Sequence, residues 1–244
     1  MINLNINGLN INYLDFGNDN SKDAIVLLHG WGQNISMMQM LGEPFKKDYH
    51  IIAIDFPGFG KSEEPKEVIG VDGYTKIVEN LLNKLNVKNP ILIGHSFGGR
   101  VAVKYASRNN VKKLILLSPA LRGHDKKGLK TKVLKFLKTV PGIKNLEDWA
   151  KDHIGSRDYK AASPVMKKVL VETVNEDLSE DAKKITVPTI LIYGDLDGEV
   201  PEEDTKEYER LIPDCGLILY DGCTHFAYLE RLNQTISIIR NFIK

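Results

Sequence analysis

Short runs of aliphatic residues recur along the chain, and they constrain its fold more than any other feature of the sequence. A strand that is buried on both faces has this pattern, because neither face meets water. Stretches with helical spacing lie between the runs, for example at 74–85. This alternation predicts an α/β fold whose sheet is mostly parallel and doubly wound. The clearest runs are at 24–28, 51–54, 91–93, 114–117 and 189–192.

Two segments depart from this alternation. Residues 2–13 alternate apolar and polar side chains around Asn7-Gly8, and both of those turn positions favour positive φ. We therefore expect an N-terminal antiparallel hairpin. Residues 119–186 contain helical patterns but no convincing strand. We expect them to form an all-helical cap inserted into a core made of residues 1–118 and 187–244.

The composition excludes several classes of protein. Hydrophobic residues make up 42% of the chain and charged residues 27%, as in ordinary globular proteins. The formal net charge of +1 does not indicate a nucleic-acid partner. No apolar run approaches the roughly 20 residues of a transmembrane helix, and the first residues do not resemble a signal peptide. We expect a cytoplasmic protein with no transmembrane segment.

Gly94-His95-Ser96-Phe97-Gly98 directly follows an apolar strand and precedes a helical pattern. In this context a G-x-S-x-G sequence is typical of a nucleophilic serine on a sharp strand-to-helix turn. A plain glycine turn with an incidental serine is the alternative, and the strand–turn–helix setting disfavours it. We therefore predict that Ser96 is the nucleophile.

A serine nucleophile needs a general base and an acid that orients it. His225 follows the strand at 217–219, and the other histidines precede turns, begin strands or lie in the insertion. Asp195 and Asp197 both follow the strand at 189–192, and the deeper position of Asp197 in the loop favours it. All these loops follow strand C-termini, where catalytic groups gather in open parallel sheets.

The loop His29-Gly30-Trp31-Gly32 also follows an apolar strand. Its glycines allow the backbone to come close to a substrate. We expect the Trp31 and Phe97 amides to form the oxyanion hole. Core packing is the simpler role for the Trp31 side chain, and it is compatible with use of the amide. This chemistry requires no metal ion and no organic cofactor.

These blocks, together with Asp55-Phe56-Pro57-Gly58-Phe59-Gly60-Lys61-Ser62, resemble the successive motifs of the α/β-hydrolase fold superfamily. The resemblance runs from residue 24 to the C-terminus and is weak across the insertion. It implies the α/β-hydrolase fold, with Asp197 as the triad acid and an architectural role for the 55–62 loop. The serine argues against the dehalogenase and epoxide hydrolase branches, which use aspartate. The tryptophan of the oxyanion loop is similar to that of the pimeloyl-carrier-protein methyl ester esterases.

The cap is expected to select the substrate, a small-molecule ester with a small or medium acyl chain. Seven basic residues and one acidic residue occupy 122–138. This segment is either a solvated helix face or a docking surface for an acidic partner, such as an acyl carrier protein, a coenzyme A phosphate or an anionic membrane. The residues expected to line the acyl pocket are Leu121, Leu134, Leu137, Trp149, Met166 and Phe226.

The predicted function is therefore that of a carboxylesterase working through an acyl-enzyme on Ser96. Two alternatives keep the same triad: hydrolysis of a carrier-linked ester or thioester, and cleavage of a carbon–carbon bond beside a ketone. A third is a non-catalytic protein that keeps the fold and binds a ligand.

Overall fold

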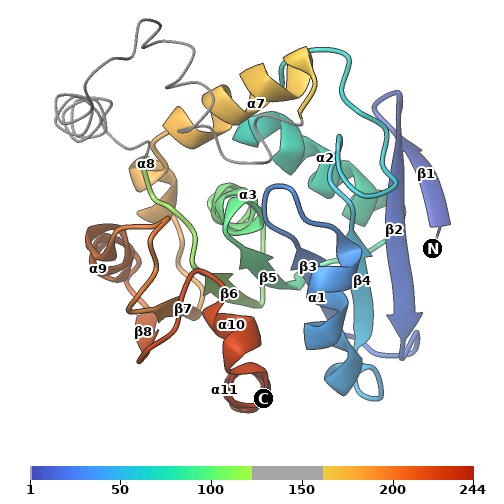
Figure 1. Cartoon of the computed structure of the whole chain (residues 1–244). Helices are drawn as coiled ribbons and strands as arrows, with labels where there is room; N and C mark the ends of the chain where they lie inside the picture. The colour runs from blue at the N-terminus through green and yellow to red at the C-terminus, as the bar shows by residue number, and fades with distance from the viewer. Residues whose placement is uncertain (1, 123–161) are drawn as a thin grey trace, which may run out of the picture.

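The apolar runs form the inner strands of one twisted sheet. The computed structural model describes residues 2–122 and 162–244, which fold into eight strands in the order β1-β2-β4-β3-β5-β6-β7-β8 (Figure 1). The strands are β1 (Ile2–Ile6), β2 (Leu9–Gly17), β3 (Ala24–Leu28), β4 (His50–Ile54), β5 (Ile91–His95), β6 (Lys113–Leu117), β7 (Thr189–Gly194) and β8 (Cys215–Tyr220). From β4 to β8 every neighbouring pair is parallel.

The predicted N-terminal hairpin is present. β1 and β2 pair antiparallel, with Ile6 opposite Leu9. Asn7 and Gly8 take φ of 53° and 83°. Positive φ at both positions is the turn conformation that an Asn-Gly pair favours. β2 then pairs antiparallel with β4 and so joins the hairpin to the parallel part of the sheet.

Helices cover both faces of the sheet, as the strand pattern predicted. Alternate strand residues point to opposite faces, so Val26 and Leu28 of β3 belong to one apolar core and Ile25 and Leu27 to the other. The first core lies under α2 (Val71–Lys84), α3 (Phe97–Ala106), α7 (Pro164–Asn175), α8 (Ser179–Ala182) and α9 (Glu202–Leu211). The second lies under α1 (Ile35–Gly42), η1 (Glu43–Phe45), α10 (Ala227–Glu230) and α11 (Leu232–Phe242).

The segment between β6 and β7 contributes α7 and α8, and its described residues contain no strand. α7 begins where the sequence provides a helix start: the Ser163 hydroxyl accepts the Met166 N–H at 3.1 Å, and Pro164 occupies the first turn. Leu134, Leu137, Trp149 and most of the basic segment 122–138 lie outside the described residues. The boundaries of the cap therefore stay a prediction.

Arg100 fastens the end of α7 to the core. Its guanidinium is 4% exposed and donates to the carbonyl oxygens of Ala120, Thr173 and Glu176. The last carbonyls of a helix lack partners within the helix, and a cation there is also favoured by the helix dipole. Lys104 supports the same junction through its ion pair with the Glu176 carboxylate at 2.9 Å.

Among residues 2–122 and 162–244, none of the helices combines the length and the hydropathy needed to cross a membrane.

Candidate active site

Ser96 occupies a strained turn between β5 and α3. Its φ and ψ are 49° and −112°, outside the conformations that a serine ordinarily adopts. Two glycines make the turn possible. A Cβ on Gly94 would lie 2.5 Å from the Gly98 carbonyl oxygen, and a Cβ on Gly98 would lie 2.3 Å from the Leu28 carbonyl oxygen. The G-x-S-x-G spacing is therefore required by close backbone contacts that hold Ser96 at the tip of the turn.

His225 and Asp197 lie together, in loops that follow β8 and β7. His225 Nδ1 is 2.9 Å from Asp197 Oδ2, and both side chains are almost fully buried. Burial alone would raise the pKa of Asp197, but hydrogen bonds from His225 and from the Val200 and Glu199 amides outweigh it, and the pKa is lowered. Asp197 is thus a carboxylate placed to fix the His225 tautomer with its proton on Nδ1.

Asp195, the other acid that the sequence offered, does not reach the imidazole. Its residue is exposed, and its side chain accepts the Cys223 N–H at 3.3 Å. Of the two aspartates in this loop, the structure brings Asp197 to His225.

A second carboxylate approaches His225 from the same loop. Glu199 Oε2 lies 3.4 Å from His225 Nε2, and the Glu199 side chain is 68% exposed. Sequence reasoning missed this residue. The available signal was its position two residues after Asp197, in a loop that folds back so that the Glu199 N–H donates to Asp197 Oδ1.

Trp31 and Phe97 lie beside Ser96, with their rings edge to face at 5.5 Å. Among the described residues, neither the Trp31 nor the Phe97 N–H donates to a backbone acceptor. Phe97 is the first residue of α3, where the helix provides no partner for its amide. Both amides therefore remain available to an oxyanion.

His29 fixes the backbone that precedes Trp31. The Phe56 N–H donates to His29 Nε2 at 3.0 Å, so the ring proton lies on Nδ1 and is donated to the Gly30 carbonyl at 2.7 Å. Burial lowers the pKa of His29 to about 4, which keeps the ring neutral. The Gly30 carbonyl and the Trp31 N–H share one trans peptide plane and point in opposite directions. By holding the carbonyl, His29 orients the Trp31 amide.

A cavity of about 260 Å³ joins these groups. Its lining includes Ser96, His225 and the two candidate oxyanion residues, together with residues of α7. The described residues that line it are Trp31, Gln33, Ser96, Phe97, Arg100, Ala120, Arg122, Leu170, Thr173, Val174, Glu199, Val200, His225 and Phe226.

The residues expected to line the acyl pocket divide between the cavity and the core. Phe226 lines the cavity, whereas Leu121 and Met166 are buried in the core and are absent from the lining. The Leu121 amide donates to Asp204, and Met166 packs on Gly58, where any Cβ would lie 2.6 Å from its sulfur. Instead, Leu170 and Val174 of α7 provide the apolar lining. Helical spacing alone does not distinguish these two roles.

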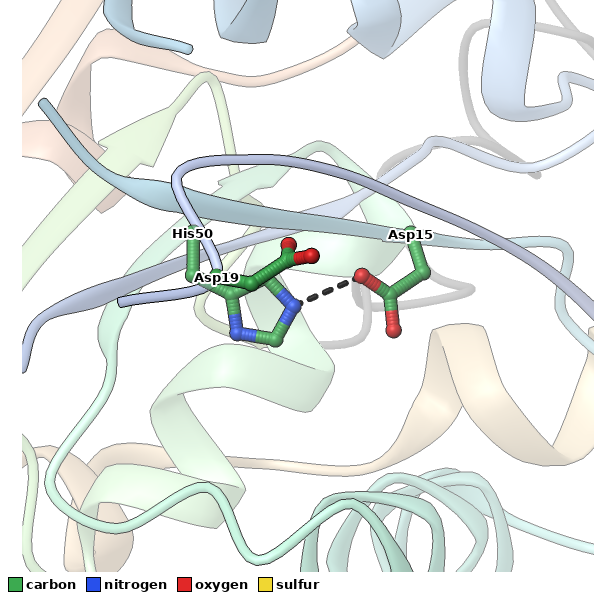
Figure 2. A group of neighbouring side chains, drawn as sticks. All are labelled: Asp15, Asp19 and His50. Carbon is green, nitrogen blue, oxygen red and sulfur yellow. Dashed lines mark hydrogen bonds and ion pairs between the residues drawn. The ribbon is translucent and has the colours of Figure 1, made fainter. Parts of the chain in front are cut away.

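The metal-ligating side chains that gather in the described chain lie away from this cavity. Asp15, Asp19 and His50 have ligand atoms within 4.8 Å of one another, and Figure 2 shows His50 hydrogen-bonded to Asp15. His50 is the first residue of β4, so the group lies at the opposite end of the sheet from the C-terminal edge that carries Ser96. An ion held there could not reach a substrate at Ser96.

Comparisons with known proteins show which proteins this chain resembles in sequence and in fold. A family model described as "alpha/beta hydrolase fold" matches residues 23–146. The chain is 28% identical to an AB hydrolase superfamily protein of Bacillus subtilis, over 89% of this chain and 90% of the relative. It is 27% identical to a pimeloyl-[acyl-carrier protein] methyl ester esterase of Aliivibrio fischeri, over 90% and 93% of the two chains. The solved structure of a bacterial membrane phospholipase A superposes with a TM-score of 0.79 at 23% identity, covering 99% of this chain and 84% of the other.

Proposed function

The chain belongs to the α/β-hydrolase fold family, and from this premise we propose that it is a serine hydrolase that cleaves acyl esters through an acyl-enzyme on Ser96. One observation carries the proposal. A serine on a strained turn shares a cavity with a histidine whose Nδ1 is bonded to a buried carboxylate, at 2.9 Å. This combination activates a hydroxyl that is otherwise a poor nucleophile.

In the proposed reaction, His225 Nε2 takes the Ser96 Oγ proton as Oγ attacks the ester carbonyl. Asp197 stabilises the imidazolium that forms. The Trp31 and Phe97 amides donate to the oxyanion, and one such donor contributes about 3 kcal/mol to lowering the barrier. The imidazolium then gives its proton to the departing alcohol. In the second half, water attacks the acyl-enzyme with the same base and releases the acid.

We assign substrate selection to a cap formed by the 119–186 insertion. Leu170 and Val174 of α7 line the same cavity as the reacting groups. An apolar wall of this kind suits the acyl chain of an ester, because burying methylene groups is favourable. The Arg100 contacts support the assignment, since they tie α7 to the helix that begins at the nucleophile.

A second candidate substrate class is an ester linked to an acidic carrier. Two observations favour it: an esterase acting on an acyl-carrier-protein ester is among the relatives, and Arg122, which begins the basic segment 122–138, lines the cavity. Hydrolysis of a carrier-linked ester would then fall steeply with salt, while hydrolysis of neutral esters would not. Equal salt dependence for the two would exclude carrier docking through this segment.

The proposed activity is tested with a series of p-nitrophenyl esters of increasing acyl length. We expect wild-type turnover that is lost in Ser96→Ala. Ser118→Ala is the matched control, because Ser118 also follows a strand with positive φ (48°), although it is buried where Ser96 is only partly buried. Turnover that survives in Ser96→Ala, or is absent from the wild type at every chain length, would contradict the proposal and favour a ligand-binding role.

A further inference from the structure

A directed chain of hydrogen bonds links the loop of Trp31 to the loop of His225. The Gly30 N–H donates to Gln33 Oε1 at 3.2 Å, and Gln33 Nε2 donates to His95 Nδ1 at 3.2 Å. His95 Nε2 then donates to the His225 carbonyl oxygen at 3.1 Å. His95 immediately precedes Ser96, so the chain passes through the turn that carries the proposed nucleophile.

The last hydrogen bond of this series, from His95 to the His225 carbonyl, fixes the direction of the others. A carbonyl oxygen only accepts, so the His95 proton lies on Nε2 and Nδ1 is left as an acceptor. Gln33 Oε1 also lies 3.3 Å from His95 Nδ1, but a bond there would need a proton on Nδ1. A proton on Nδ1 would leave Nε2 with a lone pair, which would repel the lone pairs of the His225 carbonyl oxygen. Burial lowers the pKa of His95 to about 3, so a doubly protonated ring does not resolve the conflict.

The packing around His95 leaves little freedom for these bonds to shift. His95 is fully buried, and its ring centroid lies 4.9 Å from that of His225 and 4.7 Å from that of Tyr228. On the other side, a Cβ on Gly30 would lie 2.8 Å from His95 Nδ1 and 2.9 Å from Gln33 Nε2. The backbone of the Trp31 loop therefore rests directly on the His95–Gln33 pair.

We propose that His95 and Gln33 are positioning residues. They hold the His225 imidazole and the Trp31 amide in fixed positions relative to each other and to Ser96. The proposal rests on the function proposed above. An ester attacked at Ser96 must meet the base and the oxyanion donor at the same time, and these two groups come from loops far apart in the sequence. Small misplacements of such groups are costly, since about 1 Å can cost about 100-fold in rate. Neither residue needs to contact the reacting atoms to have this effect.

The test compares His95→Phe with His95→Gln. Phenylalanine fills the ring space without hydrogen bonds, whereas glutamine keeps a donor for the His225 carbonyl. Reactive serine is titrated with a fluorophosphonate, so that kcat refers to intact sites only. We expect His95→Phe to lower kcat for a p-nitrophenyl ester by about 10- to 100-fold with KM nearly unchanged, and His95→Gln to recover most of the loss. His50→Phe, at the far end of the sheet, is the control and should keep wild-type kcat.

The second arm uses Gln33→Met, which removes both bonds of Gln33 at similar length. Because Gln33 and His95 belong to one chain, the double variant His95→Phe/Gln33→Met should be no slower than the slower single variant. Gln39→Met is the matched control, since Gln39 bonds to Glu43 on the surface of α1. If His95→Phe does not fold, Gln33→Met alone tests the proposal, because Gln33 is only half-buried. The same fall in kcat at constant KM is then expected.

The outcomes separate the two proposals. A wild type that forms no adduct at Ser96 contradicts the proposed function. A wild type that reacts normally, with His95→Phe and Gln33→Met at wild-type kcat, contradicts only the positioning role. Losses that multiply in the double variant, or losses confined to KM, also overturn it.

Discussion

The residues that line the cavity come from two parts of the molecule that are built differently. The reaction face, made of Trp31, Ser96, Phe97 and His225, is held by backbone contacts and buried hydrogen bonds. The α7 face, made of Leu170, Thr173 and Val174, belongs to a helix that Arg100 and Lys104 fasten near its end. Val174 itself is 46% exposed. Under the proposed function, the core holds the reacting groups in place, whereas an attached helix contributes to the choice of substrate.

The comparison predicts the largest loss of activity when Asp197, the acid bonded to His225 of the reaction face, loses its charge without changing shape. Asp197→Asn should lower kcat by about 10⁴-fold, because the amide no longer holds the His225 proton on Nδ1. Steady-state kinetics on a p-nitrophenyl ester measures this. Asp195→Asn is the control and should stay near wild type, since Asp195 does not contact His225. The reverse order of effects would exclude Asp197 as the acid.

Backbone crowding at the reaction face predicts a large loss of stability. Gly98→Ala would place a Cβ 2.3 Å from the Leu28 carbonyl and 2.6 Å from the His29 carbonyl. Backbone atoms cannot yield as side chains do, so the free energy of unfolding should fall by about 3 kcal/mol. Denaturant unfolding measures it. Gly216→Ala, with nothing within 4 Å of the added Cβ, should change stability little; equal losses in the two would contradict this account.

Two buried histidines that support the reaction face, His29 and His95, predict a pH dependence of stability. The pKa is lowered to about 3 for His95 and to about 4 for His29, against about 6.5 in the unfolded chain. Below pH 6.5 the unfolded chain takes up protons that the folded chain does not. Stability is therefore full above that pH and falls with acid, by up to about 1.4 kcal/mol per pH unit for each ring.

Replacing one ring isolates this effect. Between pH 7 and pH 5, the free energy of unfolding should drop by about 2 kcal/mol less in His95→Phe than in the wild type. His95→Gln should show the same smaller drop, because it also removes the imidazole. Urea unfolding at the two pH values gives the comparison. An unchanged drop in both variants would mean that His95 is protonated in the folded protein.

The α7 face predicts the smallest effect, and one confined to binding. Leu170→Ala should raise KM for medium-chain esters by about fivefold, or about 1 kcal/mol of lost apolar contact, with kcat for p-nitrophenyl acetate unchanged. Val171→Ala, one residue along the same helix and outside the cavity lining, is the control. A change in kcat for the acetate ester would show that the two faces are not independent.

The sequence predicted the reaction face better than the α7 face, for a physical reason. Ser96 is defined by glycines two residues away on each side, and Asp197 and His225 follow strands that any parallel sheet brings to one edge. Leu121 and Met166 have the same apolar character as true lining residues, but their burial depends on Asp204 and Gly58, which are distant in sequence. Such contacts exist only once the chain has folded.

The same limit applies to the bond between Gln33 and His95. Nothing near either residue indicates the other, because 62 positions separate them and their contact depends on the pairing of β3 with β5. Residues that follow strand ends could be predicted from the sequence, because a parallel sheet brings those ends to one edge, whereas a side-chain partner such as Gln33, which no motif marks, could not.

The most direct test of the account is covalent labelling with a fluorophosphonate, followed by peptide mapping by mass spectrometry. We predict one adduct per chain, on the peptide that contains Ser96, with labelling lost in Ser96→Ala and strongly slowed in Asp197→Asn. Labelling at another residue, or no adduct in folded wild-type protein, would contradict the claim that Ser96 is the nucleophile.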